Sequence, residues 1–254
     1  MPWPIAKTPS IIWAANTANL QDLESVLGRI KGHAYLGGIK IGMSLVDRYG
    51  LSRVVMAVRN LAPDLPVIWD RQSAGTGGPS LGGEFADIAK EAGVDAVVVI
   101  PLAGPVALVD WIYPCIENSI PAIAGSTVLY NSFTQSQGGY VSDEALTTTV
   151  ADAYSLGVCD FVCSSDPEEV VRCLGRLKMM PQHVADSDAE WLERCSRLEN
   201  GNRPTLYVLS PEDNRISEET RRVIGDVGWH LIVGRRTINA SILDSLVKKQ
   251  LRVL

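Results

Sequence analysis

The segment most informative about the fold is Val67-Ile68-Trp69-Asp70-Arg71-Gln72-Ser73-Ala74-Gly75-Thr76. It opens as a short apolar run, typical of a parallel strand that is buried on both faces, and its apolar part ends at Asp70. Two other segments have the same outline, Gly38-Ile39-Lys40-Ile41-Gly42 and Ile232-Val233-Gly234-Arg235. Each places a charged side chain at or near the end of a strand. In parallel α/β folds these ends carry the active site, so the three segments predict a functional site there.

Short apolar runs of this kind alternate with amphipathic stretches along most of the chain. Eight runs are candidate strands, at residues 11–15, 38–41, 66–70, 96–100, 121–125, 160–163, 205–209 and 230–233. Helical patterns separate most of them, at residues 20–30, 45–61, 83–92, 105–116, 143–156 and 167–177. Eight strands in alternation with helices predict a closed (β/α)8 TIM barrel. The 254 residues match one such domain, so we expect a single domain over residues 1–254.

Two connections are longer than the usual loops of this fold. Residues 75–83 are rich in Gly, Pro and Ser and predict a flexible loop after the third strand. Residues 180–204 form the other connection, and the pattern at 186–192 predicts an inserted helix there.

Composition excludes several classes of function. A net charge of −6 gives no electrostatic footprint for nucleic acid, and no apolar run is long enough to span a membrane. The N-terminus lacks the pattern of a signal peptide, and the five scattered cysteines fit reduced thiols, so we expect a cytoplasmic protein. The three histidines have no metal-site spacing and are expected to be structural or exposed. We expect no metal and no cofactor.

The three strand ends together resemble the orotidine 5'-monophosphate decarboxylase family, which carries an Asp-x-Lys-x-x-Asp motif after its third strand. The resemblance implies a carboxy-lyase of pyrimidine biosynthesis that binds a phosphorylated, nucleotide-like small molecule. It also implies a homodimer paired across the mouths of the barrels. It places Lys40, Asp70 and Gln72 at catalytic positions, with Lys40 and Asp70 in a charged network that contacts the ribose and faces the reacting carboxylate. Without the resemblance, Lys40 and Asp70 could equally form an ion pair that closes the barrel rim.

This chain departs from the motif at two positions, because it reads Asp70-x-Gln72-x-x-Gly75. The family uses the motif lysine for its charge and its proton, and the Gln72 amide supplies neither. Gly75 cannot supply the carboxylate that the family lends across its dimer interface. Arg71 is the nearest other cation, but neighbouring strand residues point to opposite faces, so Arg71 should point away from the pocket. Lys90 lies in an amphipathic segment and is expected to be a solvated helix residue.

The substrate-binding positions are matched in part. Asn16 stands where the family ends its first strand with Asp, and an amide can still bond a ribose hydroxyl. Gly234 and Arg235 follow the eighth strand, where this fold binds phosphate with backbone N–H groups and a helix start. The Ser-Pro of the seventh strand is followed by Glu212-Asp213-Asn214-Arg215, so a phosphate contact there falls to Asn214 or Arg215. Ser126 and Thr127 end the fifth strand, as pyrimidine contacts or as a simple turn.

Two classes of function follow from these matches and departures. The first is a decarboxylase-like barrel with weak or redirected lyase activity. The second is a catalytically inactive ligand-binding or partner protein of the same fold, which could pair with an active relative. Under both, we expect a very poor orotidine 5'-monophosphate decarboxylase, because losing a transition-state charge commonly costs a factor of about 10² to 10³. Gln72→Lys combined with Gly75→Asp is expected to raise its decarboxylase activity.

Overall fold

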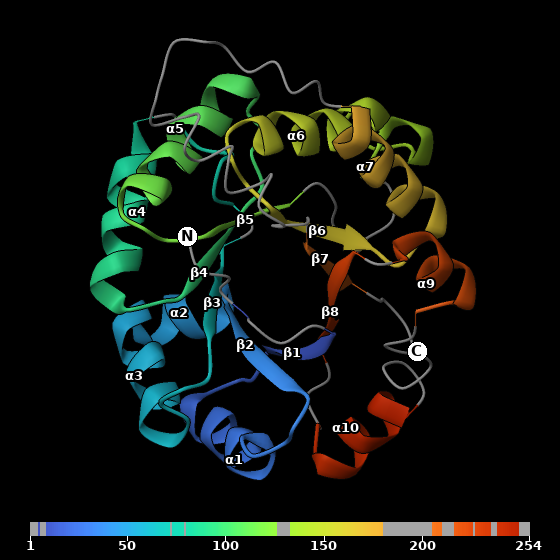
Figure 1. Cartoon of the computed structure of the whole chain (residues 1–254). Helices are drawn as coiled ribbons and strands as arrows, with labels where there is room; N and C mark the ends of the chain where they lie inside the picture. The colour runs from blue at the N-terminus through green and yellow to red at the C-terminus, as the bar shows by residue number, and fades with distance from the viewer. Residues whose placement is uncertain are drawn as a thin grey trace.

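Eight parallel strands close into a barrel in chain order, with the helices as an outer layer around them (Figure 1). The computed structural model describes residues 5, 9–71, 73–78, 80–125, 133–179, 205–209, 216–225, 227–234 and 238–248. The strands are β1 Ser10–Ala15, β2 Leu36–Gly42, β3 Val67–Asp70, β4 Ala96–Val99, β5 Ala122–Gly125, β6 Asp160–Ser164, β7 Thr205–Leu209 and β8 Gly228–Val233. The predicted (β/α)8 TIM barrel is confirmed. The predicted insertion at 180–204 lies outside the described residues.

Helices follow the strands around the barrel, as the alternating pattern predicts. They are α1 Leu20–Ile30, α2 Met43–Tyr49, α3 Leu51–Leu61, α4 Leu81–Ala92, α5 Pro105–Glu117, α6 Asp143–Ser155, α7 Pro167–Met179, α9 Glu218–Ile224 and α10 Ala240–Leu246, with a short 3-10 turn, η1, at Gln135–Gln137. Side chains of Asn19, Ser142, Ser217 and Asn239 each accept a backbone N–H of the first turn, which satisfies donors that a helix start leaves free. None of the helices in the described ranges is long and apolar enough to cross a membrane.

The single helix expected over residues 45–61 is wrong, because the segment forms two helices, α2 and α3. Gly50 separates them with φ 81°, a backbone conformation that favours glycine. Its amide donates to the Val46 carbonyl as α2 ends, and α3 begins at the next residue. Because the apolar periodicity continues through this segment, the sequence pattern did not reveal the break between α2 and α3.

Two apolar cores fill the fold, one on each face of the barrel wall. The larger core lies between the strands and the helices and includes Trp13, Trp69 and Phe161. The smaller core fills the barrel interior with residues that alternate with these along the strands, such as Ile12, Ile68, Val98, Val162 and Ile232. Side chains of the second set therefore point into the barrel. We call its carboxyl-terminal end the mouth and its amino-terminal end the floor.

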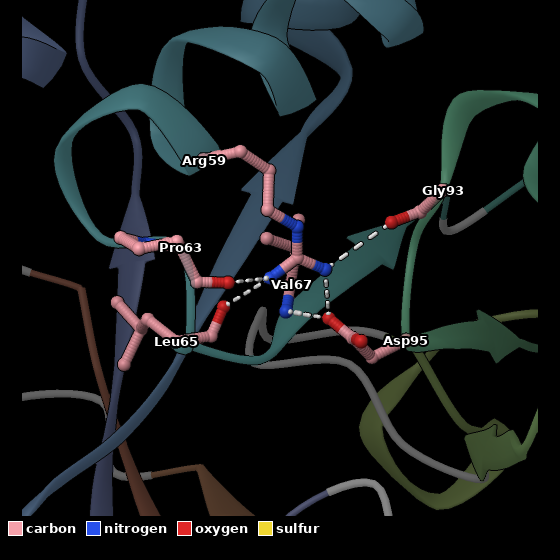
Figure 2. Close-up of polar contacts among 6 residues, drawn as sticks. All are labelled: Arg59, Pro63, Leu65, Val67, Gly93 and Asp95. Atoms are coloured by element: carbon pink, nitrogen blue, oxygen red, sulfur yellow. Dashed lines mark hydrogen bonds and ion pairs between the residues drawn. The ribbon is translucent and has the colours of Figure 1, made fainter.

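An arginine ties two loops together outside the floor (Figure 2). The Arg59 guanidinium donates to the carbonyl oxygens of Pro63 and Leu65 at 3.2 and 2.8 Å and to that of Gly93 at 3.2 Å. It also donates to Asp95 Oδ2 at 2.5 Å, and this oxygen accepts the Val67 amide at 2.6 Å. The planar fork of arginine suits such a divided set of acceptors. The contact fixes the entries to β3 and β4, the strands that lead to the candidate site.

Candidate functional site

Lys40 and Asp70 meet inside the mouth of the barrel. Lys40 pairs with Ala14 on β1 and with Ile68 on β3, and both of those neighbours belong to the interior core. Asp70 lies two residues after Ile68, so it faces the same side. The Lys40 ammonium donates to Asp70 Oδ2, with side chains only 12% and 8% exposed. The two residues form the ion pair that the sequence allowed as an alternative, and the ammonium keeps further protons to donate.

Asn16 lies at the rim of the same mouth, where β1 ends. A Cβ added to Gly42, at the end of β2, would lie 3.5 Å from Asn16 Oδ1. A Cβ added to Gly234, just after β8, would lie 3.9 Å from Asn16 Nδ2. The carboxamide therefore lies between the ends of these two neighbouring strands, and Asn16 is exposed. It presents both a donor and an acceptor at the rim, next to the strand that carries Lys40.

The loop after β3 is anchored to the loop after β4, although we expected it to be flexible. Ile100 donates its amide to the Ala74 carbonyl at 2.8 Å, and Ala103 donates to the Gly75 carbonyl at 3.4 Å. Gly75 has φ +86°, and a Cβ there would lie 2.6 Å from the Pro101 Cα. Both the conformation and the contact require glycine. The expected gain in activity from Gly75→Asp stays a prediction, and the strain that any side chain would meet at this position works against it.

Two other cations lie where the sequence placed them. The Arg71 guanidinium lies over the Trp69 ring, 5.8 Å from its centroid. Trp69 belongs to the core outside the barrel wall, so Arg71 points away from the mouth. Lys90 is exposed on α4 and donates to Asn118 Oδ1 at 3.1 Å. Neither supplies the positive charge that the motif lysine would bring.

The sequence did not predict the polar contact at the mouth end of β6. Ser164 Oγ donates to Glu169 Oε2 at 2.7 Å, and the Ser164 amide donates to Glu169 Oε1 at 3.1 Å. The sequence pattern indicated only a helix over residues 167–177 here. The signal in the sequence that could have indicated this contact was a Ser at the end of the sixth strand with a Glu five residues later.

Several predicted site residues lie outside the described part of the chain. They are Gln72, Ser126, Thr127, Asn214 and Arg235. Their assignments stay predictions from the sequence. Within the described ranges, no group of three or more His, Cys, Asp and Glu side chains could hold a metal ion.

Two solved structures share this architecture. Orotidine 5'-monophosphate decarboxylase from Methanocaldococcus jannaschii matches with a TM-score of 0.64 and 18% identity, over 96% of this chain and 100% of that one. Its structure complexed with inhibitor BMP matches with a TM-score of 0.68 and 17% identity, over 97% of this chain and 100% of that one. No protein-family model and no curated protein matches the chain. The chain therefore has an orotidine 5'-monophosphate decarboxylase-like fold, as the strand ends predicted.

Proposed function

We propose that this barrel binds a phosphorylated, nucleotide-like ligand at its mouth. The observation that carries the proposal is the inward-facing pair Lys40–Asp70, which offers donors and an acceptor close to the Asn16 carboxamide. Small-molecule sites of TIM barrels lie at this end. The similar structure complexed with inhibitor BMP supports this class of ligand. On the sequence assignment, the phosphate lies near Gly234 and Arg235, where Arg235 can grip two phosphate oxygens.

Calorimetry with uridine 5'-monophosphate tests this binding. Native protein should bind, and Arg235→Ala and Lys40→Met should each bind more weakly, by about tenfold or more, because a charge-assisted hydrogen bond is worth roughly 1.5–3 kcal/mol. Lys90→Met is the matched control, since Lys90 is an exposed helix lysine. It should bind as the native protein does. Equal affinity in Arg235→Ala and native protein would end the phosphate assignment.

The same site is a poor one for decarboxylation. Gln72 brings neither the charge nor the proton of a lysine, and the backbone at Gly75 leaves no room for a carboxylate. We propose a lyase-like barrel with weak or redirected activity. The alternative, a ligand-binding or partner protein without catalysis, is favoured by the steric requirement at Gly75.

A direct assay separates these alternatives. Native protein should consume orotidine 5'-monophosphate at least about 10²-fold more slowly than an ordinary decarboxylase, since the motif charge acts in the transition state. Gln72→Lys alone should raise the rate in part, because it leaves the Gly75 backbone intact. Native turnover within tenfold of an ordinary decarboxylase would show that another proton donor serves the site. No increase in Gln72→Lys would favour the non-catalytic alternative.

We also propose a cytoplasmic homodimer that pairs across the mouths. Large apolar side chains stand exposed in the loops and helix starts that follow β2, β3 and β4, namely Met43 at 50%, Leu81 at 47%, Leu102 at 40% and Val106 at 68%. Such groups mark association surfaces when they gather on one face. Sedimentation should show a dimer that Val106→Asp weakens and that Met56→Asp, on α3, leaves intact. A native monomer at micromolar concentration would refute the dimer.

A further inference from the structure

Polar side chains occupy the floor of the barrel, where branched apolar residues usually pack. They are Ser10, Asp160, Thr205, Tyr207 and His230, which we call the floor cluster. All five are buried, and Asp160, the most exposed, is only 7% accessible. Buried polar groups are nearly always hydrogen-bonded, because an unpaired one loses its hydration without compensation. The floor cluster therefore needs partners.

Strand register brings the cluster together. Tyr207 pairs with His230 across β7 and β8, and their ring centroids lie 4.8 Å apart. Asp160 pairs with Thr205 across β6 and β7. Ser10 pairs with His230 across β1 and β8, with its hydroxyl oxygen 2.8 Å from His230 Nδ1. Tyr207 belongs to the interior core, so Thr205, two residues earlier, faces the interior as well.

Space for this packing comes from a glycine on the neighbouring strand. A Cβ on Gly37 would lie 2.0 Å from Ser10 Oγ and 3.1 Å from Ile5 Cγ2. The pairing of β1 with β2 shifts register beside it, between Ile11 and Ile12. Ile5 is buried against the same interior core. A larger residue than glycine would displace the Ser10 hydroxyl that holds His230.

Four atoms of the cluster have no direct hydrogen-bond partner: Asp160 Oδ1, Thr205 Oγ1, Tyr207 OH and His230 Nε2. The Tyr207 phenol lies close enough to Asp160 to lower the pKa of that carboxyl against the larger effect of burial. The two groups are thus near enough to interact, but neither Tyr207 OH nor Asp160 Oδ1 meets the distance and angle of a direct hydrogen bond. Two polar groups that approach each other in this way without bonding are typical partners of a bridging water.

We propose that the floor cluster binds ordered water, held by Asp160, Thr205, Tyr207 and His230 and sealed inside the barrel. A buried water usually makes about three hydrogen bonds, within a range of two to four, which four converging atoms can satisfy. Carboxyl, hydroxyl and imidazole groups together offer both donors and acceptors. Val162 and Ile232 follow on the mouth side of the cluster, each two residues further along its strand.

Charge favours water over a cation as the occupant. Burial raises the pKa of Asp160 to about 7, and burial lowers the pKa of His230 to about 4. Burial and the neighbouring Asp160 raise the pKa of Tyr207 well above its ordinary value. Between about pH 4 and pH 7 the cluster is therefore uncharged. The other ionisable groups that the described strands direct inward, Lys40 and Asp70, lie at the mouth and pair with each other.

Replacing the Thr205 hydroxyl with a methyl group tests the proposal, because a hydrated cluster and a dry cluster predict different changes in the unfolding midpoint. If Thr205 Oγ1 bonds water, Thr205→Val loses that bond and lowers the unfolding midpoint by about 2–4 °C. If the cluster is dry, the same change removes an unpaired polar group, and the midpoint stays or rises. Thr220→Val is the matched control, because buried Thr220 donates to the Ser165 carbonyl at 2.7 Å and must lose stability in either case.

A high-resolution crystal structure of the native protein decides the question without a variant. Water density within hydrogen-bond distance of at least two of the four atoms is the expected result. A dry cluster would overturn the proposal, and so would a bound cation with shorter contacts to several oxygens. A midpoint in Thr205→Val that is unchanged or raised would overturn it as well.

Discussion

The two ends of the barrel interior contain different kinds of polar group, charged at the mouth and neutral at the floor. At the mouth, Lys40 and Asp70 carry opposite charges and face inward, with Asn16 exposed beside them. At the floor, the interior groups are neutral between about pH 4 and pH 7, and the charged pair Arg59–Asp95 stands outside the barrel wall. Charges that face inward can meet a charged ligand, whereas charges on the outside join loops. The mouth therefore suits the proposed ligand binding, and the floor suits a stabilising role.

The largest expected effect comes from Gly75→Asp at the mouth. A side chain at φ +86° costs about 1–2 kcal/mol, and displacing the Pro101 backbone adds about 1–3 kcal/mol. We expect a loss of about 4 kcal/mol in the free energy of unfolding, measured in urea. Gly78→Asp is the control, because a Cβ there meets nothing within 4 Å. Equal stability of the two variants would show that the loop moves freely.

Lys40→Met should remove about 3 kcal/mol of stability, because it leaves the carboxylate of Asp70 nearly buried and unpaired. The double variant Lys40→Met/Asp70→Leu should recover most of this loss, since it removes the stranded charge as well. Urea unfolding of both variants and of native protein measures the difference. If Lys40→Met costs less than about 0.5 kcal/mol, water solvates Asp70 and the mouth is more open than its exposure indicates.

Arg59→Ala at the floor should cost about 2 kcal/mol, since several backbone carbonyl oxygens lose their donor at once. Ligand affinity should not change, because the residue lies at the opposite end from Lys40. Arg53→Ala is the matched control on α3, where Arg53 lies over the Tyr49 ring at 5.7 Å. Thermal unfolding and calorimetry test both parts. A loss of affinity in Arg59→Ala would break the division between mouth and floor.

The smallest effect is the pH dependence that the floor cluster gives the native protein, because two opposite pKa shifts act there. The pKa of Asp160 rises from 3.8 to about 7 on folding, so its contribution to stability is lost as pH rises through that window. The pKa of His230 falls from 6.5 to about 4, so its contribution is lost as pH falls. Between about pH 4 and 6.5 folding moves one proton from His230 to Asp160, and the two effects cancel.

Asp160→Asn should expose the His230 effect. Its stability should rise with pH by about 1.4 kcal/mol per unit relative to native protein between pH 4 and 6.5, since a single group then titrates. Urea unfolding across this range gives both slopes. Parallel slopes would mean that Asp160 is ionised in the folded protein throughout the window.

Local sequence was sufficient for the barrel and for the positions of Lys40 and Asp70 at its mouth. Continuous apolar runs repeat at the spacing of a strand–helix unit, and parallel strands bring their carboxyl ends to one face. Lys40 and Asp70 could therefore be paired before the fold was seen. The prediction that the Arg71 side chain points away from the mouth followed from the alternation of side chains along a strand.

Contacts between distant segments were decided by the tertiary structure alone. Gly75 looks in the sequence like a lost aspartate, but its contact with Pro101 requires glycine. Ser10 and His230 are 220 residues apart and meet only because β1 and β8 close the barrel. Periodicity records which face of an element is buried, and it carries no information about which atoms of other elements lie against that face. The amino-acid pattern alone therefore specified the barrel and its charged mouth, whereas closure of the barrel specified the floor cluster and the contact of Gly75 with Pro101.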